Sequence, residues 1–523
     1  MSQVTFASQR RQQTPDDHLP PILPPDTPDG HGPPAPPPGR DEPRWRWGKR
    51  FGLLLLVVYF GLYAGLDLVQ WTPTALVKLA TLGGERGDAE APSVYDKVTA
   101  LVDAVSDADH EYIWYRITPW VGRHILRLND DFRAGPNGSG DTTHDYVRLL
   151  IIALLTVPVA VIVSFVLRSD KVCILLARLL YIAARYYLAL KMLSYGFDKV
   201  IKLQFPEPYT HWLTTTFGDA SPMRLVWFFM GFSEPYTIFA GAGEVLGGLL
   251  LLWRRTTTLG ALIVIAVMTN VVMMNFSYDV PVKIFSSHLL AMAMGLAALD
   301  LRRLINVFVL NRAAPPVIRP PLVRGAAAAW ALFALKLVLI GSLVYVDLEA
   351  TTGHRKARRD AIASAPFHGL WEVESFVVNG QERPPLVTDA ERWRFLHVET
   401  RQMALVRYMD GRLLFHTFAV DPAAGTVGIV VLDSDTEEVP QAPPAWTYSE
   451  PAQGVLVLEG PIGEDACTIR LRHLDVRDFN LNKRGFNWIN EFPNNWEEPI
   501  MRPRAGAAAS EEPVGQKGSA SDL

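Results

Sequence analysis

The chain has 523 residues, of which 49% are hydrophobic and 20% are charged, and its formal net charge is -4. Its two cysteines exclude a disulfide framework and any site that needs four cysteine ligands. The near-neutral balance of acidic and basic residues gives no support for a nucleic-acid partner.

The first 45 residues are rich in proline, as in Pro33-Pro34-Ala35-Pro36-Pro37-Pro38. A segment with so few apolar residues cannot bury enough surface to offset the entropy lost on ordering. We therefore expect residues 1–45 to form a disordered cytoplasmic tail. The alternative is a polyproline ligand for another domain.

An apolar segment follows at 46–71, and it is long enough to cross a bilayer as a helix. About fifty residues precede its apolar part, so we do not expect a cleavable signal peptide. Similar segments lie at 147–167, 172–201, 235–253, 257–276, 283–300 and 326–347. The sequence thus predicts a mainly α-helical membrane protein with about seven transmembrane helices, of which the last follows a linker within 313–350.

Basic residues before the first predicted span, and in every second loop after it, predict a cytoplasmic N-terminus by the positive-inside rule. The residues concerned are Arg40, Arg44, Arg46, Lys49, Arg50, Arg168, Lys171, Arg254, Arg255, Arg302, Arg303, Arg312, Arg319 and Arg324. Seven spans then place the C-terminal domain outside, although Arg355, Lys356, Arg358 and Arg359 follow the last span. Long domains cross largely regardless of charge.

The long loop at 72–146 is predicted to be extracytoplasmic, with short amphipathic helices at 93–105 and 112–127. It ends in Gly138-Ser139-Gly140-Asp141-Thr142-Thr143. A Gly-Ser-Gly run can hold a phosphate through its backbone amides, but the Lys-Ser/Thr of a P-loop is missing. The alternative is a turn that caps the next helix through Asp141 or Thr142.

Ionisable residues within the spans are the strongest functional signal, because charges at this depth are costly unless they are paired. The third span carries Arg178, Arg185, Lys191 and Lys199, and the fourth carries Glu244. Arg185 and Glu244 lie at similar predicted depth. We therefore predict an intramembrane ion pair of Glu244 with Arg185, or with Lys191 about two turns away. Gly243 and Gly247 form a GxxxG spacing that lets another helix approach closely.

More polar groups lie at the outer ends of the predicted helices, and we interpret them as a candidate ligand or proton site open to the outside. Its members are Lys199, Glu244, Asn270, Asp279, Lys283 and His288, with Asn275 nearby. The alternative is that these side chains form buried pairs that fix the packing of the bundle, or reach the interface.

Several chemistries find no support in the sequence. His288 is the sole histidine within a predicted span, which leaves no pair for a bis-histidine haem. Cys173 and Cys467 are predicted to lie at different sides of the membrane and cannot form a redox dithiol. No spacing of His, Asp or Glu indicates a metal site, and no GxSxG motif is present. Catalytic residues therefore remain unknown.

The segments Tyr195-Gly-Phe-Asp-Lys199 and Gly241-Ala-Gly-Glu244-Val-Leu-Gly-Gly248 resemble DoxX-like membrane proteins. In that family a Gly–x–x–Lys sequence lies late in the first helix of a four-helix bundle, and a Glu followed by paired Gly lies in the second. Here these positions are Gly196, Lys199, Glu244, Gly247 and Gly248. Residues 138–312 also resemble a larger bacterial subgroup with extra spans. The resemblance implies a DoxX-like bundle at 147–312, a bacterial inner membrane, and an association with redox or quinone chemistry.

Residues 365–497 contain about eight short alternating strands, which predict an antiparallel β-barrel or sandwich. The strands are expected at 371–378, 392–397, 403–408, 413–420, 427–432, 445–448, 454–459 and 468–472. Gly369-Leu370-Trp371 resembles the Gly-x-Trp start of lipocalin-like barrels. A barrel of this size either holds one small apolar ligand or is filled by its own side chains.

An aromatic and amide-rich segment at 484–496 is predicted to pack as a strap on the barrel, or to dock on the membrane through Phe486, Trp488 and Trp496. Residues 498–523 are predicted to be a disordered tail.

Two functions follow as hypotheses. In the first, the bundle binds a quinone or similar lipid within an envelope redox system, and Lys199, Asn270 and His288 converge on a lipid-accessible cleft. In the second, a packed bundle is a non-catalytic anchor, and its barrel binds a lipophile or a protein partner. The expected partners are the lipid bilayer, a quinone or other lipophilic ligand, and a membrane protein or a second copy of the chain. Quinone is the candidate cofactor.

Overall fold

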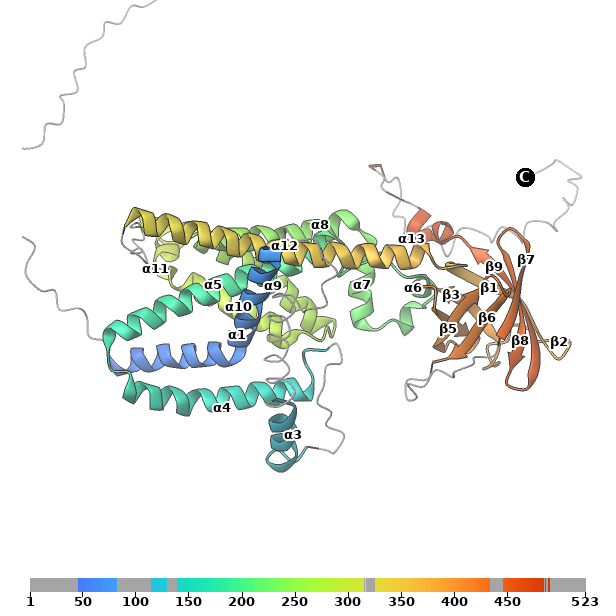
Figure 1. Ribbon diagram of the computed structural model, residues 1–523, viewed down its shortest axis with the longest axis horizontal. Coiled ribbons are helices and arrows are strands. Elements are labelled where there is room, and N and C mark those ends of the chain that lie inside the picture. The colour runs from blue at the N-terminus through green and yellow to red at the C-terminus, as the bar shows by residue number, and fades with distance from the viewer. Residues whose placement is uncertain are drawn as a thin grey trace, which may run out of the picture.

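The computed structural model describes residues 46–81, 114–128, 139–314, 325–432 and 445–483, together with residues 316, 485, 488 and 489. Side chains are described to residue 65 within the first helix. The predicted tails at 1–45 and 498–523, the helix at 93–105 and most of the strap at 484–496 lie outside these residues. The described chain forms a helical bundle and a C-terminal β-barrel (Figure 1).

Each of the seven predicted spans coincides with a helix. These helices are α1 (Trp47–Thr81), α4 (Thr143–Val166), α5 (Asp170–Val200), α8 (Glu234–Leu251), α9 (Thr257–Ser277), α10 (Lys283–Ala298) and α12 (Ala326–Ala363). Shorter helices connect them: α3 (Tyr115–His124), α6 (Thr210–Leu213), the 3₁₀ turn η2 (Phe217–Asp219), α7 (Pro222–Phe232), α11 (Leu301–Leu304) and the π-helix η3 (Ile305–Val309).

Five helices of the described chain are long and apolar enough to cross a membrane, namely α1, α4, α5, α9 and α12. A sixth span is obtained if α10 and the segment Leu301–Val309, bent by 70°, are counted as one. The predicted fourth span, α8, is less apolar because its 18 residues include two glutamates and four glycines. The described chain is therefore a mostly helical protein with several membrane-compatible helices.

Two helix ends differ from the prediction. α1 continues ten residues beyond the predicted end at 71, and α12 continues sixteen residues beyond 347. Polarity marks where a helix can leave the membrane, but it does not stop the helix. The extension of α12 carries the chain to the barrel, which lies at one end of the bundle (Figure 1).

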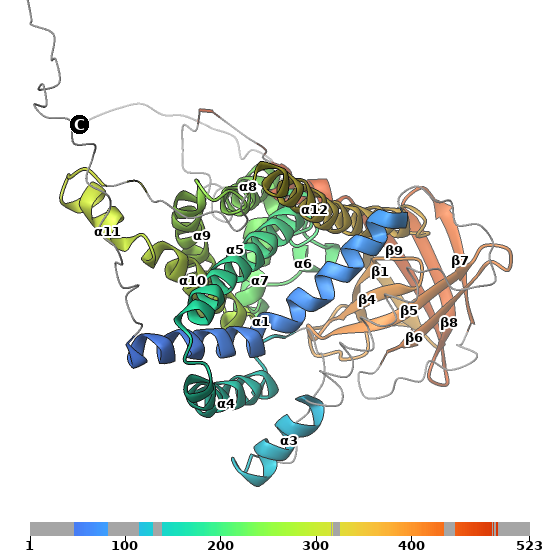
Figure 2. The same ribbon diagram turned by 60° about the vertical axis from the view of Figure 1, so that its left-hand side comes forward.

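α5 is the central helix of the bundle and contacts α1, α8, α10 and α12 (Figure 2). Its antiparallel contact with α8 is made by small residues: a Cβ at Gly241 would lie 2.7 Å from the carbonyl of Gly196, and one at Gly248 would lie 2.9 Å from that of Ala189. The predicted GxxxG pair, Gly243 and Gly247, faces α9 instead, through Val267 and Val264. Close approach at this spacing is thus confirmed, and further glycines join α8 to α5.

Contacts between helix ends define two ends of the bundle. At one end, Arg50 pairs with Asp170 at 2.6 Å, and Thr258 is hydrogen-bonded to Asp300. At the other end, the Asp141 carboxylate accepts hydrogen bonds from the backbone N–H groups of Lys283 (2.6 Å) and Ile284 (2.9 Å). The chain alternates between these ends from α4 to α12, as the predicted topology requires (Figure 1).

The turn before α4 has a structural role. Thr142 and Asp145 form a capping box at the start of α4, and Asp141 caps α10. Both contacts support the capping interpretation of the Gly-Ser-Gly-Asp-Thr segment, since its side chains are used by two helix N-termini. α3 lies within the helix predicted at 112–127.

The C-terminal domain is an eight-stranded antiparallel barrel in up-and-down order, closed by pairing of β1 with β9. Its strands are β1 (Gly369–Val378), β3 (Trp393–Val398), β4 (Met403–Tyr408), β5 (Leu413–Asp421), β6 (Thr426–Val431), β7 (Ala445–Ala452), β8 (Val455–Ile462) and β9 (Asp465–Leu474). The two-residue β2 (Gln381–Glu382) extends β1 through a turn at Asn379 and Gly380, both with positive φ. A short turn η4 (Val476–Asp478) and α13 (Asn480–Lys483) follow. All eight predicted strands are confirmed.

The barrel interior is filled by its own side chains. Its buried cluster has 19 residues, and the largest of them are Trp371, Phe376, Trp393, Phe418 and Trp446. Tyr408 and His416 add a polar pair inside, with 3.3 Å between Oη and Nε2. Of the two alternatives for the barrel, this packing favours the filled one.

Candidate functional site

The main polar site of the bundle is a buried ion pair between α5 and α8. Lys199 Nζ lies 2.8 Å and 2.9 Å from the two carboxylate oxygens of Glu244. The side chains are 7% and 2% exposed, respectively. Glycines at 196, 241 and 248 let the two helix backbones approach, and this closeness brings Lys199 over Glu244. Both predicted candidate residues therefore lie in one site.

The predicted partners of Glu244 were wrong. Because Gly241 lies against Gly196 and Gly248 against Ala189, Glu244 is level with the C-terminal part of α5. Arg185 is then level with the end of α8, about two turns from Glu244. Lys191 instead lies 5.5 Å from the ring centroids of Tyr187 and Phe285. Arg185, Lys191 and Lys199 all lie on α5, so the partner of Glu244 among them depends on the register between α5 and α8.

Two aspartates beside this pair were not singled out from the sequence. Ser194 of α5 donates to Asp347 of α12 (2.8 Å), and Thr351 of α12 lies 3.2 Å from Asp198 of α5. Both contacts join residues 153 positions apart, as expected for parallel helices in constant register. A sequence signal for these contacts was present: Ser194 and Asp198 are four residues apart, as are Asp347 and Thr351. This spacing puts each polar pair on one face of its helix.

These groups form what we call the α5–α8–α12 cluster: Ser194, Asp198, Lys199, Glu244, Asp347 and Thr351. Asp198 and Asp347 are half-buried, whereas Lys199 and Glu244 are buried. Asp347 Oδ2 is buried and has no hydrogen-bond partner among the described residues. The cluster therefore combines a closed ion pair with two carboxyl groups that accept hydrogen bonds from hydroxyl groups of the described chain.

The predicted outer cluster does not form as one site. Lys283 pairs with Asp279 at 2.8 Å and lies 3.8 Å from Asp141, at the start of α10. Asn270 is exposed on α9, and no hydrogen bond joins it to the other candidates in the described chain. Asn275 is buried and donates to Ser286. These residues mainly stabilise the turn and helix start at 275–286.

His288 forms a separate group with α1. Its Nε2 lies 2.6 Å from the hydroxyl of Tyr59, its ring stacks on Tyr63 at 4.0 Å, and its Nδ1 faces the carbonyl of Ile284 at 2.7 Å. The Nδ1–H therefore donates to the backbone, and Nε2 accepts from Tyr59. His288 thus bonds to α1 and Lys199 to Glu244, and no hydrogen bond joins Lys199, Asn270 and His288 in the described chain.

A second polar site, which we call the barrel–α6 joint, connects the barrel to the bundle, and no sequence motif predicted it. The outer faces of β3 and β4 present His397, Glu399 and Arg407 to the segment 201–221 around α6. Thr210 Oγ1 donates to Glu399 (2.9 Å) and also lies 3.2 Å from Nδ1 of His397. Arg407 donates to Thr215 (2.9 Å), and His211 lies 3.1 Å from Glu399.

Burial shapes the electrostatics of this barrel–α6 joint. Burial, with smaller contributions from the nearby His211 and Arg407, lowers the pKa of His397 to about 3. Burial alone would raise the pKa of Glu399, but hydrogen bonds from His211 and Thr210 lower it below its ordinary value. The joint therefore contains a neutral imidazole and an ionised carboxylate.

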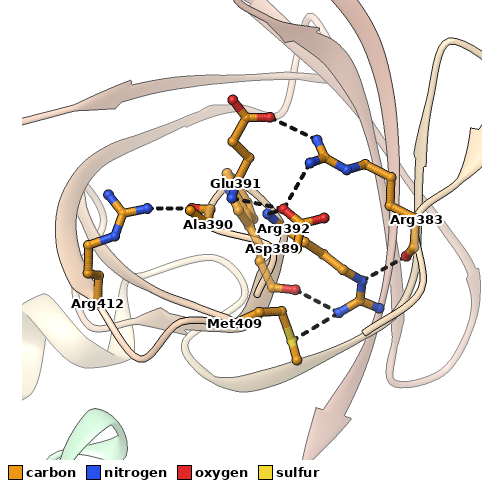
Figure 3. Close-up of polar contacts among 8 residues, drawn as sticks. Arg383, Asp389, Ala390, Glu391, Arg392, Met409 and Arg412 are labelled. Atoms are coloured by element: carbon orange, nitrogen blue, oxygen red, sulfur yellow. Dashed lines mark hydrogen bonds and ion pairs between the residues drawn. The ribbon is translucent and has the colours of Figure 1, made fainter. Parts of the chain in front are cut away.

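The barrel also carries a polar network that braces the loop between β2 and β3 (Figure 3). Arg383 pairs with Asp389 (2.8 Å) and Glu391 (2.9 Å). The buried Arg392 donates to the carbonyls of Arg383 and Trp393 and to Sδ of Met409. The arginine donors are thus bonded to acceptors within the barrel, so we infer that the network stabilises the barrel.

Metal and thiol chemistry find no site in the described residues. They contain no group of three His, Cys, Asp or Glu side chains arranged to hold a metal ion. Cys173 and Cys467 are both buried free thiols, one in α5 and one in β9, and burial raises the pKa of Cys467 to about 11. A neutral, buried thiol is a poor nucleophile.

Comparison with known proteins gives one informative match. No family model matches the chain, and no solved structure matches it. The chain is 35% identical over 124 residues to the uncharacterized protein YwoB of Bacillus subtilis (strain 168). The match covers 24% of this chain and 79% of YwoB. The chain therefore belongs to the same family as YwoB.

Proposed function

We propose that this member of the YwoB family is a DoxX-like protein of a bacterial inner membrane, and that its bundle binds the polar head of a quinone or similar lipid. In this proposal the protein is a subunit of an envelope redox system. The N-terminus is cytoplasmic and the barrel extracytoplasmic. Seven helices span the membrane, with α8 shielded from lipid in part by its neighbours.

The observation that carries the proposal is the α5–α8–α12 cluster. Lys199 and Glu244 compensate each other's charge, which makes a buried pair tolerable within a bundle. Asp198 and Asp347, half-buried and bonded to hydroxyls, can hold or release a proton. Reduction of a quinone takes up two electrons and two protons, so a ligand of this class suits a site with proton donors beside a cation.

We assign the role of each residue in this site from the exposure of its side chain. The Lys199–Glu244 pair forms the closed base of the site. Asp198 and Asp347 face the ligand and exchange protons with it, and the electrons come from a partner protein of the redox system. His288 and Asn270 have no role in this binding site.

The test is lipid analysis of the full chain extracted with its native membrane. We expect about one quinone-class lipid per chain by mass spectrometry, and at least a tenfold lower content in Asp347→Asn. Glu234→Gln is a matched control, because Glu234 is an exposed acid on α8. A wild-type preparation without quinone-class lipid would contradict the proposal.

A second candidate function is a non-catalytic anchor whose barrel binds a protein partner. The filled barrel interior and the barrel–α6 joint favour this candidate, because they fix a closed barrel on the bundle. The same packing disfavours a lipophile inside the barrel. The lipid analysis distinguishes the two functions, since the anchor retains no quinone.

A further inference from the structure

Arg185, whose predicted partner was wrong, is a buried cation without a counter-ion in the described chain. The residue is 3% exposed, and its Nε and Nη1 make no hydrogen bond with any described group. Two aromatic rings lie beside it: the guanidinium carbon is 4.6 Å from the ring centroid of Tyr186 and 5.5 Å from that of Tyr181. No described carboxylate lies within ion-pair distance of it.

A second cation approaches the same ring from α12. Lys336 Nζ lies 5.6 Å from the centroid of Tyr186 and 4.8 Å from that of Trp253, and it donates to the carbonyl of Leu252 at 2.5 Å. It too forms no ion pair among the described residues. Two positive charges therefore share one tyrosine ring between α5, the end of α8 and α12.

This arrangement leaves positive charge uncompensated. Like charges repel, and burial removes the water that would otherwise solvate the guanidinium. The attraction of a cation to an aromatic face is weaker than the penalty for burying an unpaired charge. An anionic group supplied from outside the described chain would use the free donors of Arg185 and neutralise both cations.

We propose that Arg185 and Lys336 form a binding site for a phosphate-class anion, which we call the Arg185–Lys336 site. The anion is the headgroup phosphate of an anionic phospholipid or free phosphate. The surroundings favour a lipid, because exposed apolar side chains lie nearby. They are Trp253 and Leu335, and Trp330 six residues before Lys336 on α12. The site lies near the middle of α5 and at the C-terminal end of α8, where Lys336 meets the Leu252 carbonyl. Basic pockets between helices bind anionic headgroups.

The test measures lipid and phosphate binding to the delipidated full chain in a neutral detergent. Native mass spectrometry with phosphatidylglycerol and phosphatidylcholine should show at least tenfold tighter binding of phosphatidylglycerol. Arg185→Gln should remove that preference. Arg178→Gln should retain it, because Arg178 is an exposed cation seven residues earlier on the same helix.

A parallel thermal unfolding series with inorganic phosphate alone distinguishes the sources. Stabilisation by phosphatidylglycerol but not by phosphate identifies a lipid site, and stabilisation by phosphate alone identifies a free-anion site. Absence of both effects overturns the proposal, as does wild-type binding by Arg185→Gln. If Arg185→Gln fails to fold, Lys336→Met provides the same readout at the half-buried cation, and unchanged binding there also overturns the site.

Discussion

At the scale of single residues, the Lys199–Glu244 pair dominates the energetics of the bundle. Removal of one partner leaves the other as a buried charge without compensation. We expect Lys199→Met to lower the free energy of unfolding by about 3–5 kcal/mol. Thermal unfolding of the purified full chain, followed by loss of helical circular dichroism, measures this change.

The double variant Lys199→Met/Glu244→Gln supplies the critical comparison. It removes both charges, so its unfolding temperature should lie above that of Lys199→Met. Glu234→Gln should unfold like the wild type, because Glu234 is exposed. Equal stability of Lys199→Met and the wild type would show that the pair does not carry the charge balance described here.

The buried ionisable residues of the bundle were easier to identify from the sequence than their pairing partners. Lys199 and Glu244 were identified because ionisable residues in apolar helices are costly. Their pairing depends on helix register, which the glycines at 196, 241 and 248 set through backbone contacts. Asp198 and Asp347 were missed because their partners, Ser194 and Thr351, are neutral. His397 and Glu399 were missed because strand alternation does not reveal which outer face is covered.

At the scale of elements, the α5–α8 contact depends on the absence of side chains at two positions of α8. An added Cβ at Gly241 or Gly248 would lie within 3 Å of a carbonyl oxygen of α5. Because backbone atoms cannot move aside independently, the helices must separate. We expect Gly241→Ala and Gly248→Ala each to lower the free energy of unfolding by about 1–3 kcal/mol, as overpacking does.

Gly295→Ala in α10 is the matched control. A Cβ at this position meets nothing within 4 Å, so the variant should gain about 0.5–1 kcal/mol from helix propensity alone. The three variants are compared by thermal unfolding under identical conditions. If all three behave alike, helix propensity rather than close packing determines the effect.

The elements themselves followed from sequence periodicity. All eight barrel strands were predicted because alternating side chains and turns such as Asn379-Gly380 report strand pairing directly. The ends of α1 and α12 were not, because the prediction used apolarity, and a helix can continue beyond an apolar segment. Residues 351–363 of α12 are polar and still helical.

At the scale of the whole molecule, the alternation of helices, together with the proposed cytoplasmic N-terminus, predicts which surfaces face each side of the membrane. Both native cysteines are buried, so single introduced cysteines can report accessibility. We expect Asp219→Cys and Glu464→Cys to react with a membrane-impermeant maleimide on intact spheroplasts. Arg255→Cys should react only after the membrane is opened.

All three positions are exposed in the structure, so burial does not account for a difference. Wild-type protein is the control for background labelling. Labelling of Arg255→Cys together with Asp219→Cys before opening would contradict the alternation. Protection of Glu464→Cys alone would place the barrel on the cytoplasmic side.

The joint between barrel and bundle should weaken in acid, and this effect belongs to the molecule as a whole. His397 is fully buried in the joint, with a pKa of about 3, whereas an exposed histidine titrates near a pKa of about 6.5. Between these values the undocked state binds more protons than the docked state. The free energy that favours docking therefore decreases by about 1.4 kcal/mol for each pH unit below about 6.5, and by about 2 kcal/mol between pH 7 and 5.

The other charged groups at the joint do not cancel this dependence. Glu399 has a lowered pKa, so its contribution is lost only at pH values below its ordinary range. Arg407 stays charged, and a protonated His397 would lie near it and near His211. Hydrogen exchange of residues 201–221, corrected for intrinsic rates, should thus show weaker protection at pH 5 than at pH 7.

His397→Gln tests the assignment of this effect to one side chain. The variant cannot titrate, so the protection of residues 201–221 should become nearly independent of pH over the same range. His416→Gln is the matched control, because His416 is also buried with a lowered pKa but lies inside the barrel. If His397→Gln retains the full pH dependence, another group controls docking, and the neutral imidazole at the joint has only a packing role.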